Sequence, residues 1–398
     1  MTAVNNQSTK IVRSLHVAFE LSWGQWKLAF GTQAADNPRL RTVNGRDRLA
    51  VLREITAAKT KFRLPADAPV VCCYEAGRDG HWLHRFLSAQ PGFTCHEVDS
   101  SSIEVNRRQR RAKSDKLDAG KLLSMLIRYE GGERQVWRVV HVPSVEAETQ
   151  RHLHRELEDW QDQRRQHSNR IKGLLASEGH DVEVDGEFPR QLALLRNWSD
   201  SPVAEALQAR LLRQYEGWQF ADGKVKELEK QRSRAIHAEE AGQGRVRELL
   251  ALKGIGAASA WLFVREVFGW RKIKNRRQMG SLAGLTPTPY ASGKSSREQG
   301  ISKAGNRRLR VMALEIAWCW VQFQPKSELT LWFLTRFGLG KRSRKIGIVA
   351  VARKLLVALW KYVEHGEVPK GAELVDWKKK VRLPREVGVA AKRGRSAG

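Results

Sequence analysis

One segment of the chain, residues 282–310, restricts the fold more than any other because it cannot form a long helix. It reads LAGLTPTPYASGKSSREQGISKAGNRRLR, and prolines and glycines interrupt it throughout. These interrupting residues are Pro287, Pro289, Gly293, Gly300 and Gly305. We therefore expect loop backbone up to about Arg307, where a helix can begin.

The same segment gathers positive charge and hydroxyl groups. Its six basic residues and four serines are Lys294, Arg297, Lys303, Arg307, Arg308, Arg310, Ser292, Ser295, Ser296 and Ser302. Hydroxyls and exposed N–H groups beside cations suit a phosphate group. Ser292 precedes a glycine that permits a sharp turn, so it is a candidate nucleophile. Local composition alone favours a plainer interpretation, a flexible basic surface loop.

The net charge of the whole chain points to a polyanionic partner. Lys and Arg outnumber Asp and Glu by 71 to 43, which gives +28 at pH 7. Such an excess repels itself and is typical of proteins that bind nucleic acid. A membrane surface is the competing partner, but we find no run of 18 apolar residues, no signal peptide and no basic amphipathic anchor. We expect nucleic acid as the partner and no membrane.

The four cysteines, Cys72, Cys73, Cys95 and Cys319, lack the spacing of a zinc site. Buried free thiols in a reducing cytoplasm explain them best. We therefore expect a cytoplasmic protein.

The first third of the chain predicts an α/β layer. Short apolar segments at residues 14–22, 25–30, 68–77 and 93–98 have strand length, and residues 46–61 and 77–87 show helical stripes. A further helix is expected from Ser114, its N-cap, to about Tyr129. Strands that alternate with helices favour some parallel pairing.

The rest of the chain predicts helices. Two long polar helices, at 144–179 and 203–241, fit an antiparallel coiled-coil arm that could also dimerise; an ordinary helical linker is the alternative. Residues 249–270 resemble a helix-hairpin-helix with its turn at Gly254 and Gly256, which would let a phosphate approach backbone amides. The fold class is thus α/β plus all-α, with domains at 1–143, 144–243 and 244–377 and a basic disordered tail at 378–398.

Four carboxylates in the first domain can form a metal site. They are Glu20 in the first strand, Glu75 at the end of an apolar strand, and Asp115 and Asp118 on one face of a helical first turn. A carboxylate that ends a buried strand is costly unless paired or metal-bound, so Glu75 carries the strongest signal. Two cations about 3.5–4 Å apart need such a set of ligands.

The order of these motifs resembles the RuvC-like members of the ribonuclease H superfamily. More closely, the chain resembles the DEDD transposases of insertion-sequence family one-hundred-and-ten and its eleven-eleven subgroup, the bridge-RNA-guided serine recombinases. The segments that carry the resemblance are FELSWGQWKLAF, CCYEAG, KSDKLDAGKLL, LKGIGAASA and the 282–310 segment. They occur in family order between about Leu15 and Val363.

The resemblance implies a mechanism and its residues. The metal-binding acids would be Glu20, Glu75, Asp115 and Asp118, holding Mg²⁺, and the nucleophile would be Ser292. Glu20 departs from the family, whose first acid is usually Asp, and the extra methylene puts metal geometry in doubt. Serine attack would give a phosphoserine and a free 3′-OH, at a site composed of the RuvC-like and serine domains of neighbouring subunits. Donor and target DNA, a structured non-coding guide RNA and a homodimer or homotetramer are the implied partners.

The nucleic-acid-binding residues that we predict are mostly basic. They are Arg107, Arg108, Arg110, Arg111, Lys113, Lys253, Gly254, Gly256, Lys294, Arg297, Lys303, Asn306, Arg307 and Arg310. Two other functions stay open: a metal-dependent RuvC-like nuclease or junction resolvase that uses the carboxylates alone, and a nucleic-acid-binding protein whose catalytic site has decayed.

Overall fold

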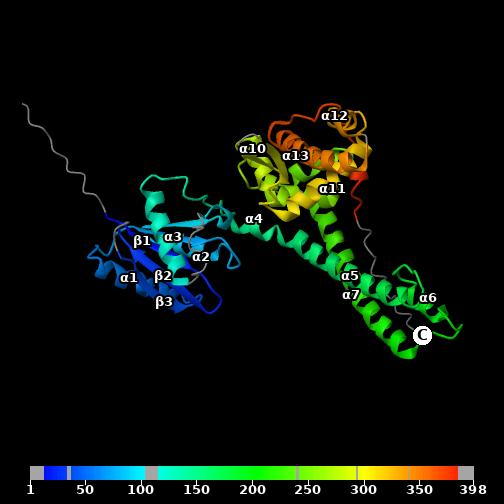
Figure 1. The fold of residues 1–398 in the computed structure, drawn as a ribbon, viewed down its shortest axis with the longest axis horizontal. Helices are drawn as coiled ribbons and strands as arrows, with labels where there is room; N and C mark the ends of the chain where they lie inside the picture. Colours follow the sequence, from blue (N-terminus) through cyan, green and yellow to red (C-terminus); the bar gives the residue numbers. More distant parts are fainter. Residues whose placement is uncertain are drawn as a thin grey trace, which may run out of the picture. The chain divides into compact units, whose positions relative to one another are not determined.

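A computed structural model describes residues 13–33, 37–103, 115–238, 242–292, 295–338 and 340–383 of the chain. Within it the chain divides into two compact units, Met1–Val142 and Pro143–Gly398, here called the N-terminal and C-terminal units (Figure 1). Separate apolar clusters fill the two units.

The N-terminal unit is built on a mixed five-stranded sheet with strand order β3-β2-β1-β4-β5. The strands are β1 (Leu15–Glu20), β2 (Gln25–Gly31), β3 (Arg39–Asn44), β4 (Val70–Glu75) and β5 (Phe93–Val98). The first three form an antiparallel meander, whereas β4 pairs in parallel with both β1 and β5. The predicted strands and the parallel pairing are confirmed.

Helices cover both faces of this sheet. On one face, α1 (Arg48–Lys61) and α2 (Trp82–Ser88) pack on alternate strand residues such as Val17, Phe19 and Tyr74. On the other face, α3 (Asp115–Glu130) packs on the intervening residues Ala18 and Cys73. Because strand side chains alternate between faces, each strand contributes to two cores. The cysteines of this unit are buried and free, as expected.

Two long helices of the C-terminal unit form an arm. They are α5 (His152–Ala176), preceded by α4 (Val145–Thr149), and α7 (Glu205–His237), with the short α6 (Phe188–Leu194) between them (Figure 1). Leu157 packs against Leu228, and Leu175 belongs to the cluster that contains Leu211, so the pair is antiparallel. The predicted helices and their antiparallel packing are confirmed.

The remainder of the unit is a helical bundle around a large apolar core of its own. Its helices are α8 (Gln243–Ala251), α9 (Ala257–Phe263) with the π-helical turn η3 (Val264–Phe268), α10 (Arg276–Leu282), α11 (Arg307–Phe323), α12 (Glu328–Phe337) and α13 (Lys341–His365). The predicted start of a helix at Arg307 is confirmed. No helix among the described residues has the length and apolarity needed to cross a membrane.

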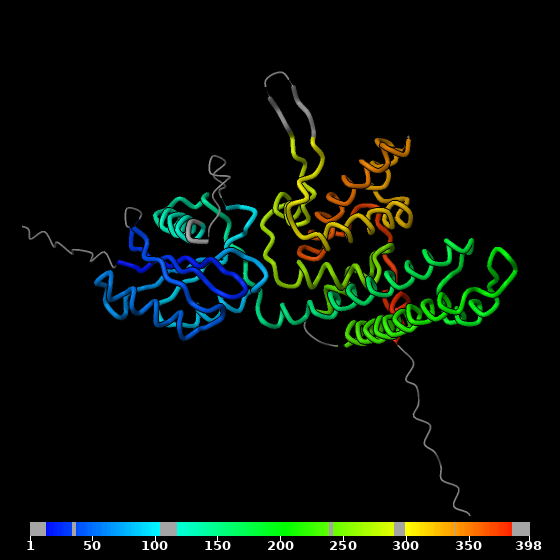
Figure 2. Tube along the Cα trace, turned by 60° about the horizontal axis from the view of Figure 1, so that its bottom comes forward, coloured from blue at the N-terminus to red at the C-terminus, as the bar shows by residue number. Residues whose placement is uncertain are grey.

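The 282–310 segment is a β-hairpin rather than a loop. Strand β6 (Pro287–Ser292) pairs antiparallel with β7 (Ser295–Ile301), with an irregularity between Pro287 and Pro289. The loop prediction is wrong because proline is compatible with a two-stranded edge, where its missing N–H costs no ladder bond. Figure 2 shows the two strands leaving the helical bundle together.

Residues at the predicted start of the tail are folded. A 3₁₀ turn, η4, spans Trp377–Lys379, and Val381 is buried. The Lys380 ammonium donates to the carbonyl oxygens of Leu250, Leu252 and Ile255 at 2.7, 2.7 and 3.1 Å. The described chain therefore continues to Leu383, and residues 384–398 lie outside the description.

Candidate functional site

Glu20 and Glu75 end two neighbouring parallel strands at the same edge of the sheet. Phe19 pairs with Tyr74, so the next residues in each strand, Glu20 and Glu75, stand side by side. Phe19 and Tyr74 face α1 and α2. Since side chains alternate along a strand, both glutamates belong to the opposite face, which α3 covers.

The direction of α3 brings its first turn to that same edge. The Leu122 carbonyl lies 3.8 Å from the Cys73 sulfur, two residues before Glu75. Further along the helix, Leu123 and Ile127 lie over Gly31, where an added Cβ would be 3.2 and 3.8 Å from their side chains, and Gly31 pairs with His16 near the start of β1. The helix thus runs against β1, and Asp118 in its first turn belongs to the carboxyl edge. We call Glu20, Glu75 and Asp118 the carboxylate edge.

The burial that we expected for Glu75 is wrong. The sequence suggested a buried carboxylate, but burial along β4 stops at Tyr74, and Glu75 is exposed. Its place at a strand end, rather than its burial, is what supports a role. Glu20 and Asp118 are partly exposed.

The donor set at this edge suits a hard cation, because carboxylate oxygens are the ligands that Mg²⁺ prefers. Among the described residues, however, no three His, Cys, Asp or Glu side chains lie close enough together to hold a metal. Asp115, the fourth predicted ligand, is the first residue of α3, and its side chain lies outside the description. The structure therefore brings the backbone positions to one edge without a preformed ligand cluster.

A cationic aromatic cluster follows the two glutamate strands, and sequence reasoning missed it. Trp23, in the turn after β1, is 70% exposed. The guanidinium carbons of Arg46 and Arg78 lie 4.7 and 4.9 Å from its ring centroid. Arg78 is in the loop after β4, and Arg46 also pairs with Asp79 at 2.5 Å. An exposed indole with two guanidinium groups can stack on a base and meet its phosphate.

A buried carboxylate on the other face has a different role. Glu97 on β5 is 2% exposed, accepts a hydrogen bond from the Tyr74 hydroxyl at 2.9 Å and lies 2.7 Å from His81 Nδ1. Burial and the nearby Glu97 raise the pKa of Tyr74 far above its ordinary value. Because Tyr74 faces α1 and α2, this network joins β4 to β5 on the face of the sheet opposite to the one that α3 covers.

In the C-terminal unit, Ser292 is the last residue of β6 and pairs with Ser295. The turn between them, Gly293 and Lys294, lies outside the described residues, as do the side chains of residues 290–298, which include Ser292 and Arg297. The structure thus places the backbone of Ser292 at the end of β6, next to the turn of the hairpin.

Hydrogen bonds tie down the base of the hairpin. The Ser302 N–H donates to the Thr286 carbonyl at 2.8 Å, and the Thr286 hydroxyl lies 3.1 Å from that of Ser302. Gly305 has φ +141°, and a Cβ there would meet the Leu282 carbonyl oxygen at 2.6 Å. Arg310 donates to the carbonyls of Ala283 and Lys303 at 3.2 and 3.0 Å. These contacts restrict the backbone at the base of the hairpin, where β6 begins and β7 ends.

A buried carboxylate joins this base to the arm. Glu266, in the π-helical turn η3, is 2% exposed. It lies 2.9 Å from His154 Nε2 and accepts hydrogen bonds from Arg155 at 2.9 Å and from the Asn306 amide at 3.2 Å. Burial opposes its charge, but the hydrogen bonds and charges of His154 and Arg155 prevail and lower its pKa to about 2. π-turns occur often at functional sites.

Other predicted nucleic-acid contacts have varied surroundings. Asn306 caps α11, accepting from the Leu309 N–H at 3.2 Å, while Lys303 and Arg307 are exposed. Lys253, which precedes the turn of the predicted helix-hairpin-helix, pairs with Glu373 at 2.8 Å. In that turn Gly254 has φ +88°, and Gly256 directly precedes α9. The basic residues of the segment before α3 lie outside the description; they are Arg107, Arg108, Arg110, Arg111 and Lys113.

The fold is that of a two-part chain, a mixed α/β sheet followed by a helical unit, with acids at one sheet edge and a serine-bearing hairpin. Residues 246–330, from α8 through the hairpin to the start of α12, match the family described as Transposase IS116/IS110/IS902 family. The chain belongs to this family of insertion-sequence transposases, enzymes that cut and rejoin DNA.

Similar proteins support the assignment over nearly the full length. The chain is 37% identical over 378 residues to "Putative transposase y4rJ" of Sinorhizobium fredii, covering 90% of this chain and 94% of that protein. It is 23% identical over 305 residues to "Transposase for insertion sequence element IS1328" of Yersinia enterocolitica, covering 75% and 85%. The resemblance inferred from the motifs is confirmed at the level of the family.

Proposed function

We propose that this protein cuts and rejoins DNA through a covalent bond to Ser292, with Mg²⁺ held by Glu20, Glu75, Asp115 and Asp118. The observation that carries the proposal is the register of β1 and β4, which sets two glutamates side by side at the edge that also receives the first turn of α3. The antiparallel meander followed by parallel strands supports a RuvC-like domain over residues 1–143.

The covalent step exchanges one phosphoester bond for another. The Ser292 oxygen attacks a DNA phosphorus and loses its proton, the new O–P bond forms, and the bond to the 3′ oxygen breaks. The 3′ oxygen takes up a proton, so the products are a 5′-phosphoserine and a free 3′-OH with no net change in protons. Attack by a 3′-OH on the phosphoserine reverses the chemistry and rejoins DNA, so no outside energy source is needed.

Different residues of the chain would bind the metal, neutralise charge and position the serine. The carboxylate edge would bind the cation, and Mg²⁺ held there would polarise the phosphate and favour ionisation of the serine. The exposed Lys303 and Arg307, with Lys294 and Arg297, would neutralise charge that develops on the phosphate oxygens. The hydrogen-bonded base of the hairpin would limit the positions that Ser292 can take.

Further partners follow from charge and architecture. A net charge of +28 supports binding of both DNA and a structured non-coding guide RNA, which would choose the target by base pairing. The antiparallel arm of α5 and α7, over residues 144–243, would be the element that joins copies into a homodimer or homotetramer. Residues 244–377 would form the serine domain.

The test is capture of the covalent bond. We expect wild-type protein, incubated with guide RNA, Mg²⁺ and nicked substrate DNA and then digested, to give a DNA-linked peptide modified at Ser292. Ser292→Ala should give no adduct and no cleavage, whereas Ser296→Ala, the matched control on the facing strand, should retain both.

Two results would contradict the assignment. An adduct on Ser302 would move the nucleophile to the hairpin base. Undiminished cleavage by Ser292→Ala would instead indicate a metal-dependent nuclease that uses the carboxylates alone.

A further inference from the structure

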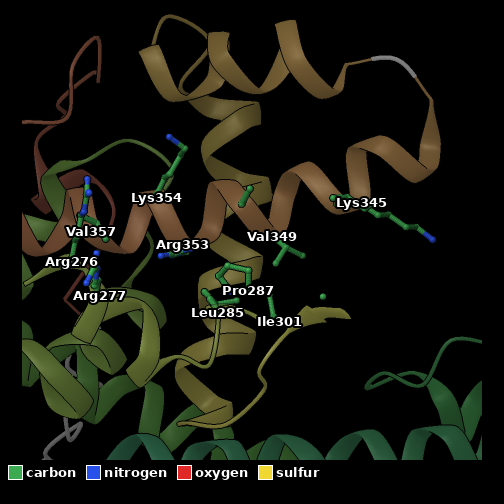
Figure 3. Close-up of a pocket in the computed structure, with 13 residues that line it drawn as sticks. Arg276, Arg277, Leu285, Pro287, Ile301, Lys345, Val349, Arg353, Lys354 and Val357 are labelled. Atoms are coloured by element: carbon green, nitrogen blue, oxygen red, sulfur yellow. The ribbon is translucent and has the colours of Figure 1, made fainter. Parts of the chain in front are cut away.

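The C-terminal unit contains a pocket of about 830 Å³ between the base of the serine hairpin and helix α13 (Figure 3). Its floor is aliphatic and includes Leu285, Pro287 and Ile301 from the hairpin base and Val349 from α13. Figure 3 shows Val349 facing Pro287 and Ile301 across the pocket. The hairpin that bears Ser292 thus forms one wall of this site.

The rim of the pocket is basic. Five cations and no acids contribute to the lining, the cations being Arg276, Arg277, Lys345, Arg353 and Lys354. Arg276, Arg277 and Arg353 gather at one end, and Lys345 lies toward the other (Figure 3). Helix α13 presents this face through residues spaced about one turn apart, Lys345, Val349 and Arg353, while Ile348, Val351 and Leu355 enter the core.

These five cations lack acidic partners, which sets them apart from other basic groups of the unit. None of them pairs with a carboxylate in the part of the chain that the structure describes, although Lys354 lies 4.5 Å from the Trp332 ring. By contrast, Lys253 and Arg308 pair with Glu373 and Glu158. Unpaired cations around a concave surface attract an anionic ligand.

The combination of floor and rim selects the kind of ligand. A duplex offers phosphates but keeps its bases stacked inside, so it has nothing to place on an apolar floor. An unpaired strand offers both, because its bases can turn toward apolar side chains while its phosphates meet Lys and Arg. We propose that this pocket binds an unpaired segment of the DNA strand next to the bond that the hairpin serine attacks.

This inference rests on the proposed function, because that function places the DNA cut at Ser292. It goes further by naming the pocket that holds the strand next to the cut. Exchange of strands separates the bases beside the cut from their partners, so unpaired nucleotides arise there. Holding them at the hairpin base would keep the scissile phosphate within reach of the hairpin end. The pocket would then act in binding and positioning, not in the bond-breaking step.

Binding in the absence of chemistry tests the proposal. Affinity for single-stranded DNA, duplex DNA and single-stranded RNA is measured by fluorescence anisotropy over a salt series, using Ser292→Ala protein without Mg²⁺. We expect Arg276→Gln with Lys345→Gln to lower the salt slope for single-stranded DNA by about 0.7 for each phosphate that is no longer neutralised. Ile346 and Val349 are aliphatic residues of α13 that line the pocket. Ile346→Ser with Val349→Ser should weaken that affinity about fivefold without changing the slope.

Matched controls separate the pocket from general charge and fold. Arg213→Gln with Lys230→Gln removes two exposed cations of α7 that also lack a carboxylate partner among the described residues, and it should leave single-strand affinity nearly unchanged. Leu331→Ser, on α12, matches the exposure of Ile346, 52% against 58%, and should have no effect on binding. Melting temperatures check that each variant is folded.

Three outcomes would overturn the proposal: an equal decrease in affinity for duplex DNA, a decrease confined to RNA, or no effect of the floor substitutions. Each differs from failure of the proposed function, which would appear as cleavage without Ser292 while binding to the pocket persisted.

Discussion

The carboxylate edge and the serine hairpin reach their positions in different ways. The edge is set by a parallel strand register and by the direction of one helix, with Glu20 and Glu75 at the ends of β1 and β4. The hairpin is set by a network at its base, where Gly305, Arg310 and Asn306 fix the backbone and Glu266 anchors Asn306. Substitutions in the two regions are therefore expected to have different effects on cleavage and on stability. Changes at the edge should affect chemistry alone, whereas changes at the hairpin base should affect stability and chemistry together.

The largest effect should come from the edge. Glu75→Gln or Asp118→Asn should lower the rate of DNA strand cleavage about 1,000-fold or more, because each would remove one of the oxygen ligands that we propose for the metal. The melting temperature should move by no more than about 2 °C, since Glu75 is exposed and Asp118 partly so. Asp67→Asn is the matched control, an exposed carboxylate that precedes the same strand at its other end. Full cleavage by either variant would remove that residue from the site.

Sequence reasoning was successful where a periodic pattern decides the structure. The alternating apolar residues of β1 and β4 and the stripes of α5 and α7 specified their elements, and the strand ends then located two of the acids. The identity of the family was readable from motifs alone.

Sequence reasoning failed where tertiary contacts decide the structure. Prolines in β6 suggested a loop, but an edge hairpin does not need their N–H groups. Lys380 looked like a residue of a solvated tail, yet three carbonyls at the end of α8 and in the following turn bind its ammonium. The partners of Glu266 come from positions more than 100 residues before it and 40 after it, which no local pattern reveals.

The second prediction concerns the anchor of the hairpin base. Glu266→Gln should lower the free energy of unfolding of the C-terminal unit by about 3–5 kcal/mol, because it leaves His154 and Arg155 without their buried partner. Cleavage should fall as well, since Asn306 loses its anchor at the start of α11. Urea unfolding of both proteins gives the difference. Glu158→Gln, which breaks only the partly exposed pair with Arg308, is the control and should cost less than about 1 kcal/mol.

The same carboxylate predicts a dependence on pH. Its pKa is lowered to about 2 in the folded protein, so its contribution to stability is fully present above the ordinary carboxyl pKa of 4.5. That contribution is lost as the pH falls from 4.5 through about 2. The stability difference between wild type and Glu266→Gln should therefore shrink when urea unfolding is repeated at pH 7, 4 and 3. A difference that stays constant over this range would show that Glu266 is not held ionised by His154 and Arg155.

A smaller loss of stability should follow from crowding the hairpin base. Gly305→Ala places a Cβ against three backbone atoms, of Leu282, Gly284 and Ser281, at 2.6–2.8 Å, so the backbone must move. We expect a loss of about 2–3 kcal/mol and reduced cleavage. Gly300→Ala is the matched control: its φ is +89°, but no atom lies within 4 Å, so only the conformational cost of about 1 kcal/mol applies. Equal effects at the two glycines would mean that the close approach at Gly305 is unimportant.

The smallest effect should come from removing basic residues at the end of the chain. Deletion of residues 384–398 removes four basic residues, Arg385, Lys392, Arg393 and Arg395, and leaves Lys380 and Val381 in place. We expect unchanged stability and cleavage, with the salt slope for duplex DNA reduced by about 0.9 for each phosphate that these residues neutralise.

Deletion from Lys378 onward should in addition destabilise the C-terminal unit, because the carbonyls of Leu250, Leu252 and Ile255 lose their shared donor and Val381 leaves the core. Thermal unfolding of the two truncated proteins measures the change in stability, and a salt series measures the change in the slope of DNA binding. Identical melting temperatures would show that residues 378–383 add nothing to the fold, and they would then belong with the charged end rather than with the helical bundle.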